Sequence, residues 1–144
     1  MNEDPIFGHS LALVEGDIVL TEGKLQLMHS KENLLQALNL RVQTPSGTDL
    51  LNTTYGLAIQ EAFTQPGTLS QIKEYIKLSL VQTLTTDPRV HDVREILFAD
   101  DPRYLPQQTQ TDLDTMRHSR FWKADVVLDT LDAQTATLSL TLGV

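Results

Sequence analysis

The chain has 144 residues, of which 40% are hydrophobic and 21% charged, with a formal net charge of −8 and no cysteine. This length and composition predict a single globular domain over residues 1–144, with a core of its own. The absence of cysteine excludes disulfides and thiolate metal sites. Nucleic-acid phosphates and anionic membranes would repel so acidic a chain, so neither is expected as a partner.

Residues 1–29 contain only short apolar stretches, separated by Glu15-Gly16 and Glu22-Gly23. Such pairs are typical of turns, so we expect an N-terminal arm of short paired strands or a small meander. No internal repeat is found in the chain. The first ten residues lack the apolar segment of a secretory signal, and no apolar run approaches the ~20 residues of a membrane helix, so we expect a soluble chain.

A helix is predicted over residues 31–43, with Ser30 as its N-cap, because aliphatic residues recur there at helical spacing. These residues are Leu34, Leu35, Leu38 and Val42. The helix should end at the stretch TPSG, where a proline and a glycine favour a turn. Tyr55-Gly56 then predicts a tight bend, followed by a short helix at 57–63.

The most regular helical pattern covers residues 69–86. Thr68 and Gln71 match a capping box, and the aliphatic residues form one stripe. Pro88 should end the helix, because the residue before a proline avoids the helical region.

A strand at 89–100 and a polar loop at 101–119 are expected next, followed by a C-terminal hairpin in which apolar and polar residues alternate. Trp122 opens the inward face of the hairpin. The strand 135–142 is a natural sheet edge, and its outward positions carry no charge that would block an added strand. Those positions are Thr135, Thr137, Ser139 and Thr141. Together these elements predict the α+β class: a small mixed β-sheet with a C-terminal β-hairpin, packed against two to three helices.

No pattern in the sequence indicates catalysis. The nucleophile elbow Gly-x-Ser-x-Gly and the glycine-rich phosphate loop are both absent, and the four histidines lack metal-ligand spacing. A glycosidase needs two carboxylates across one cleft, and pairs such as Asp100 with Asp101, or Glu61 with Glu74, are not distinguished from ordinary surface acids. We therefore expect no enzyme activity, no cofactor and no metal.

The order of several short motifs along the chain says more about function than any catalytic motif does. Arg41, Thr44 and Gly47 are followed by Tyr55-Gly56, and a helix later leads to Asp87-Pro88-Arg89 and an aliphatic residue. Over residues 30–98 this order resembles the baseplate wedge, or sheath-initiator, family of contractile phage tails, which has relatives in type VI secretion and extracellular injection systems. The chain departs from the family pattern at Asp87, where glutamate is usual, and at Thr54, where proline often stands.

The resemblance implies a structural subunit that lies in the tail baseplate of a virion or injection system, in several copies of a sixfold assembly, and is made in the bacterial cytoplasm. Its partners would be the helical bundle of the wedge proteins and the sheath protein; tube or hub proteins are further candidates. In the family, sheath chains add strands to the sheet, which implies that strand 135–142 or its partner 121–130 accepts them.

The resemblance also implies that Asp87, Pro88 and Arg89 contact the wedge bundle. An arginine suits an interface because its five donors and its charge persist when it is partly buried. Pro88 would fix the direction of the chain, and Asp87 would hold Arg89 or contact the partner itself. Arg41, Gly47, Tyr55 and Gly56 are expected to be structural.

A plainer interpretation remains for each of the two features. The segment Asp87-Pro88-Arg89 can be a helix stop followed by a solvated cation, and the strand 135–142 can be an ordinary uncharged edge strand. Two other functions stay open for the whole chain. One is an unrelated small α+β protein-binding module, and the other is a tail-associated cell-wall hydrolase. Labels containing the word lysozyme exist in the family, but the residues above give no support for that activity.

Overall fold

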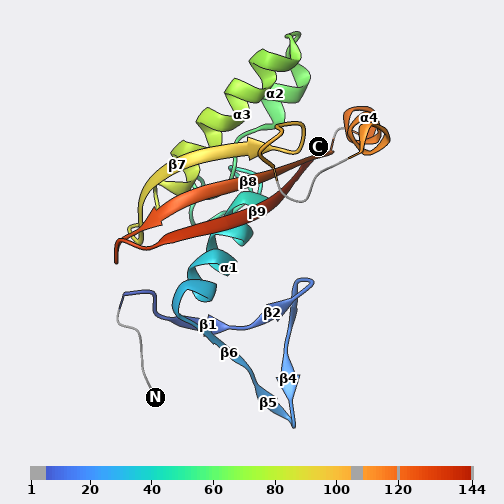
Figure 1. Cartoon of the computed structure of the whole chain (residues 1–144). Helices are drawn as coiled ribbons and strands as arrows, with labels where there is room; N and C mark the ends of the chain where they lie inside the picture. The colour runs from blue at the N-terminus through green and yellow to red at the C-terminus, as the bar shows by residue number, and fades with distance from the viewer. Residues whose placement is uncertain (1–5, 105–108, 120, 144) are drawn as a thin grey trace.

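The computed structural model describes residues 6–104, 109–119 and 121–143. Within these residues, six short strands form an N-terminal arm and three long strands form the main sheet; three helices lie between the arm and the sheet, and a fourth lies between its first and second strands (Figure 1). The arm strands are β1 His9–Leu11, β2 Leu13–Val14, β3 Asp17–Ile18, β4 Leu20–Thr21, β5 Lys24–Leu25 and β6 Leu27–His29. The helices are α1 Ser30–Gln43, α2 Gln60–Thr64, α3 Leu69–Leu84 and α4 Gln110–Ser119. The long strands are β7 Val90–Phe98, β8 Phe121–Thr130 and β9 Thr135–Gly143.

The main sheet has the order β7-β8-β9, and its strands run antiparallel. β8 and β9 pair without interruption from Phe121–Gly143 to Asp129–Thr135, which confirms the predicted hairpin. The inward residues of this hairpin alternate with exposed Thr and Ser along β9, as one buried face requires. Trp122 lies in the core, as predicted.

Helices α1 and α3 cover one face of the sheet and form the main core together with the inward residues of β7, β8 and β9. Most of the two predicted aliphatic stripes is buried, with Leu34 and Leu38 from α1 and Ile76, Leu80 and Leu84 from α3, but Leu69 at the start of α3 is 40% exposed. The capping box of Thr68 and Gln71 is present at the start of α3. The predicted α+β class is therefore confirmed.

Two local predictions are wrong. His29, and not Ser30, occupies the N-cap of α1 and forms no side-chain cap bond, and Ser30 has a φ of 56°, in the left-handed region. The polar stretch 101–119 contains α4, whose first turn is capped by reciprocal bonds between Thr109 and Asp112. Leu113 and Met116 of α4 then pack on the other face of the sheet in a second cluster, with Leu97, Ala99 and Tyr104.

The arm consists of three two-stranded pairs that meet at one point: β1 with β6, β2 with β3 and β4 with β5. Three hydrogen bonds close a ring at that point, from Ala12 N to Gln26 O, from Gln26 N to Val19 O and from Val19 N to Ala12 O, at 2.9, 3.0 and 3.1 Å. The tips of two pairs are Glu15-Gly16 and Glu22-Gly23, with φ values of 51–87°, which confirms both predicted turns.

The ring positions 12, 19 and 26 are spaced by seven residues, so the arm has a pseudo-threefold internal repeat that the sequence reading missed. Two units are a strand, a turn and a second strand, β2–β3 and β4–β5, and the two ends of the arm, β1 and β6, pair to form the third. A period of seven residues lies well below the lengths at which structural repeats are usually sought. In Figure 1 this arm extends away from the body beneath the start of α1.

Candidate functional site

The Asp-Pro-Arg segment forms the junction between α3 and β7. Asp87 is 3% exposed, and its Oδ1 accepts hydrogen bonds from the backbone N and the Nε of Arg89, both at 3.0 Å. Its Oδ2 accepts a third bond from Arg89 Nη2 at 2.8 Å. The carboxylate and guanidinium therefore meet in the two-pronged geometry that favours this pair.

Both charges of the junction are stabilised by their pairing. Burial alone would raise the pKa of the Asp87 carboxyl, but the hydrogen bonds from Arg89 and the charges of Arg89 and Arg41 outweigh it, so the pKa lies below its usual value. The hydrogen bond to Asp87 raises the pKa of Arg89 above its ordinary value. The pair therefore stays ionised throughout the neutral range.

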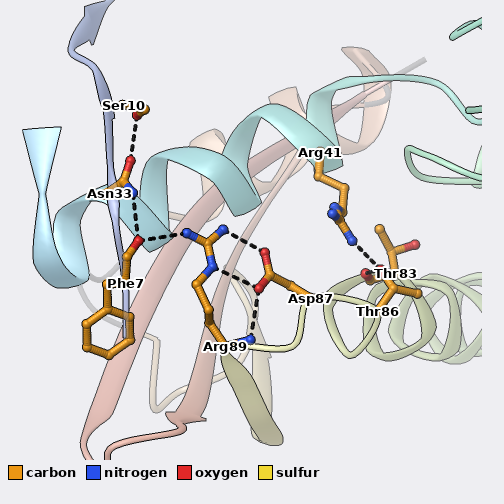
Figure 2. A network of polar contacts seen from close by, with 8 residues as sticks. All are labelled: Phe7, Ser10, Asn33, Arg41, Thr83, Thr86, Asp87 and Arg89. Atoms are coloured by element: carbon orange, nitrogen blue, oxygen red, sulfur yellow. Dashed lines mark hydrogen bonds and ion pairs between the residues drawn. The ribbon is translucent and has the colours of Figure 1, made fainter. Parts of the chain in front are cut away.

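Arg89 also binds the start of the described chain. Its Nη1 donates to the carbonyl oxygen of Phe7 at 3.0 Å, and Asn33 Nδ2 donates to the same oxygen at 2.8 Å (Figure 2). The ring of Phe7 is buried in the core. Three of the five guanidinium donors thus act inside the chain, and about a quarter of the Arg89 side chain is exposed. The suggestion that Asp87 holds Arg89 agrees with this geometry, whereas the partner-binding role of Asp87, Pro88 and Arg89 stays a prediction.

Two amides of α1 extend this connection into the arm. Asn33 Oδ1 accepts a bond from Ser10 Oγ at 2.5 Å. Gln36 donates to the Leu11 carbonyl and accepts from the Leu13 backbone N, both at 2.9 Å. Sequence reasoning missed both residues. The sequence feature that could have revealed them is an amide side chain beside the aliphatic stripe of a helix. A buried amide requires hydrogen-bond partners, so such a residue predicts a contact with another segment.

The earlier motif lies next to the junction. Arg41 places its guanidinium 5.0 Å from the centre of the Tyr55 ring and hydrogen-bonds Thr86, at the end of α3. Thr83 Oγ1 donates to the Gly56 carbonyl at 3.4 Å. Figure 2 shows Arg41, Thr83 and Thr86 near Asp87, on the side away from Arg89. Segments that the sequence reading linked only by their order are therefore neighbours in space.

Gly56 is needed because the backbone turns sharply beside the end of α1. Its φ is +107°, and a Cβ there would lie 2.3 Å from the carbonyl oxygen of Thr44. That same oxygen accepts from Leu57 N at 2.8 Å. Gly47 has a φ of +85° in the predicted turn, with open space around it. Both glycines therefore have backbone angles that disfavour other residues, and the purely structural role of Arg41 and Tyr55 stays a prediction.

The second candidate feature is the free edge of β9. Within the described residues, β9 pairs only with β8. Thr130 N donates to Gln134 O at 2.9 Å, and these two residues continue the register in which even-numbered residues of β8 face even-numbered residues of β9. The even-numbered residues of the two strands are therefore the hydrogen-bonded pairs. Because hydrogen-bonded and non-hydrogen-bonded pairs alternate along antiparallel strands, the odd-numbered residues of β9 direct N–H and C=O away from β8. Ala99 N bonds Lys123 O at 2.9 Å on the β7 side, which agrees with this alternation.

The predicted outward residues of β9 are therefore also the residues whose backbone groups face the edge. Their side chains are exposed: Thr135, Thr137, Ser139 and Thr141. Two of them are bound to carboxylates of β8, Ser139 to Asp125 at 2.8 Å and Thr135 to Asp129 at 3.3 Å. Whether the edge receives a partner strand stays a prediction.

The carboxylates weighed as catalytic pairs have partners within the chain. Asp100 pairs with Lys73, Asp101 with Arg103 and Glu74 with Lys77. Three surface depressions, of about 530, 270 and 340 Å³, are each lined by at most one carboxylate. Among the described residues there is no group of three or more metal-ligating side chains, and no described helix is long and apolar enough to cross a membrane.

Comparison with protein-family models gives no match, and comparison with curated proteins also gives none. A solved structure is similar: a "putative tail lysozyme" from Geobacter sulfurreducens, at 11% sequence identity and a TM-score of 0.57. The match covers 89% of this chain and 96% of that chain. At this identity the similarity shows that the two proteins share a fold over nearly their whole lengths.

Proposed function

We propose that this chain is a structural subunit of a contractile-tail or contractile-injection baseplate, which joins the wedge proteins to the first sheath ring and starts sheath assembly. The proposal rests mainly on one observation: the ordered motifs around Arg41, Tyr55-Gly56 and Asp87-Pro88-Arg89 converge on one side of the fold. The shared fold with a protein described as a putative tail lysozyme adds support.

The edge of β9 suits the attachment of a sheath strand. Thr135, Thr137, Ser139 and Thr141 direct backbone donors and acceptors outward, so an incoming extended segment can continue the sheet. No charged side chain of β9 opposes it, and lysines or prolines are the usual means by which an edge resists addition. The inward leucines of β9 remain in the core, so addition does not require the sheet to open.

Docking on the wedge would use the surface around the junction. Pro88 is exposed, and a quarter of Arg89 is accessible although the rest is held by Asp87 and Phe7. A side chain fixed in this way loses little conformational freedom when a partner binds it.

The test uses prolines at the edge. Thr137→Pro with Thr141→Pro removes two outward N–H groups and no hydrogen bond within the sheet, whereas Thr137→Ala with Thr141→Ala keeps both groups. We expect both variants to fold. Purified baseplates carrying the proline variant should fail to nucleate sheath, and those carrying the alanine variant should nucleate it normally. Normal sheath on proline-variant baseplates would contradict the edge as the acceptor, and absence of the chain from baseplates would contradict the function.

A cell-wall hydrolase is the second candidate, since the similar structure is described as a putative tail lysozyme. It requires two carboxylates across a cleft that can act as acid and base or nucleophile. A turbidity assay with purified peptidoglycan decides this. Clearing that disappears on replacing Asp100, Asp101, Glu61 or Glu74 with the corresponding amide would establish hydrolysis.

A further inference from the structure

One face of the arm is covered by aliphatic side chains. In extended strands, residues two apart point to the same face, and directly paired residues share it. The pairs Leu11–Leu27, Leu13–Ile18 and Leu20–Leu25 flank the hydrogen-bonded ring at 12, 19 and 26, so alternation places all six on one side. We call these six residues the arm face.

The arm face is open to solvent. Five of its members are 38–64% exposed, and Leu13 is half-buried. The ring residues Ala12, Val19 and Gln26 have the opposite orientation and are half-buried themselves. A cluster of six aliphatic side chains at the end of a projecting arm is the kind of exposed apolar patch that marks an interaction site in soluble proteins.

The arm face is also held in a fixed orientation. The ring of three hydrogen bonds joins the three strand pairs, and Asn33 and Gln36 of α1 fasten the arm to the body. The Phe7 carbonyl, bound by Arg89, fixes the chain just before β1. Preorganisation of this kind reduces the entropy lost on binding.

The tips beside the arm face are acidic. Glu15, Asp17 and Glu22 lie at the two turns against a single lysine, Lys24. Two copies joined face to face would bring these acids together, and an anionic membrane would repel them. A protein surface with aliphatic side chains and a border of lysine or arginine complements both the apolar and the charged part.

We propose that the arm face is a docking surface for a second protein that presents an aliphatic patch bordered by basic residues. This inference does not depend on the proposed function. It assigns a contact to residues 11–27, whereas the proposed function uses the junction and β9.

The test is site-specific photo-crosslinking in cells that express the chain from its own gene. A photoreactive residue is placed at position 20 or 25, with position 50 as the control, because Leu50 is an exposed leucine outside the arm. We expect the yield of crosslinked product from positions 20 and 25 to be at least tenfold higher than the yield from position 50. The crosslinked partner peptide should carry aliphatic residues with lysine or arginine nearby. Glu15→Lys with Glu22→Lys should reduce the yield at least fivefold.

Three results would overturn the inference: crosslinking only to other copies of this chain, a yield at 20 and 25 no higher than at 50, or a yield unaffected by the charge reversal. Vesicle flotation supplies a further check with the purified chain. Binding to phosphatidylcholine or phosphatidylglycerol vesicles that Leu20→Ser with Leu25→Ser abolishes would assign the face to lipid instead. Protection of the Ala12, Val19 and Gln26 amides from hydrogen exchange verifies that each variant keeps the ring. A partner that is not a tail protein would support the arm face while contradicting the proposed function.

Discussion

The Nη1 atom of Arg89 lies 3.0 Å from the carbonyl oxygen of Phe7, although 82 positions separate the two residues in the sequence. This bond, with the paired bonds to Asp87, joins the start of the described chain to the junction between α3 and β7. The junction is therefore a structural connection of the fold, whatever partner binds it.

Removing the guanidinium should destabilise the chain. Arg89→Ala leaves the nearly buried Asp87 carboxylate without its cation and the Phe7 carbonyl without one donor, so we expect a loss of about 2–4 kcal/mol in the free energy of unfolding. Urea denaturation at pH 7 measures it.

The chain supplies a matched control. Asp101-Pro102-Arg103 repeats the tripeptide and its local bonds, with Arg103 N, Nε and Nη2 bound to the Asp101 carboxylate at 2.9, 3.2 and 3.0 Å. The Arg103 side chain is 65% exposed and that of Asp101 27%, so Arg103→Ala should leave the denaturation midpoint nearly unchanged. Equal losses from the two variants would show that burial and the Phe7 bond contribute nothing.

Stability should fall in acid partly through Asp87. Its pKa is lowered in the folded chain relative to about 3.9 in the unfolded one, so the unfolded state takes up the proton first as the pH falls. The contribution of Asp87 is complete above about pH 5 and is lost as the pH drops through the folded pKa. Urea titrations between pH 7 and pH 2.5 measure the slope. The Asp87→Asn variant should be less stable at pH 7, and its free energy of unfolding should fall less steeply as the pH decreases. An unchanged slope would exclude Asp87 as a source of the acid sensitivity.

Alanine substitutions at Gly47 and Gly56 should distinguish the energetic cost of backbone strain from that of a steric clash. Gly47→Ala places a side chain at a positive φ with open space around it and should cost about 1 kcal/mol. Gly56→Ala adds a collision with the Thr44 carbonyl and should cost at least about 3 kcal/mol. Thermal denaturation of both variants checks the order. A Gly56→Ala protein as stable as Gly47→Ala would mean that the two segments can move apart.

Amide exchange should alternate along β9. The Leu138 and Leu140 amides bond to β8 and should exchange slowly in the isolated chain. The Thr137, Ser139 and Thr141 amides point to the free edge and should exchange rapidly. Residue-resolved hydrogen exchange by NMR tests this pattern. Uniform protection along β9 in the monomer would contradict a free edge, while protection of the odd positions after assembly would support strand addition.

Much of the local structure followed from sequence patterns. The turns at Glu15-Gly16 and Glu22-Gly23 need φ above zero, and glycine permits it. The capping box of α3 and the alternation in β8 and β9 also depend on near neighbours, so they were predictable. The helix α4 was missed because its few apolar residues, Leu113 and Met116, become meaningful only when they pack on Leu97 and Tyr104.

The candidate site shows the same division. The order of the motifs was visible in the sequence, but their convergence was not, and Asn33, Gln36 and Phe7 were not predicted to take part. The seven-residue spacing of the arm became a repeat only through hydrogen bonds between positions 12, 19 and 26.

The two Asp-Pro-Arg segments share their local bonds but differ in their contacts with the rest of the chain. Each tripeptide forms the same bonds within itself, because a carboxylate two residues before an arginine can reach both its backbone N–H and its guanidinium. The sequence alone therefore determined the local pairing at both sites. The packing of α1, α3 and the arm decided that Asp87 is buried and that Arg89 meets Phe7, because those contacts join residues far apart in the chain.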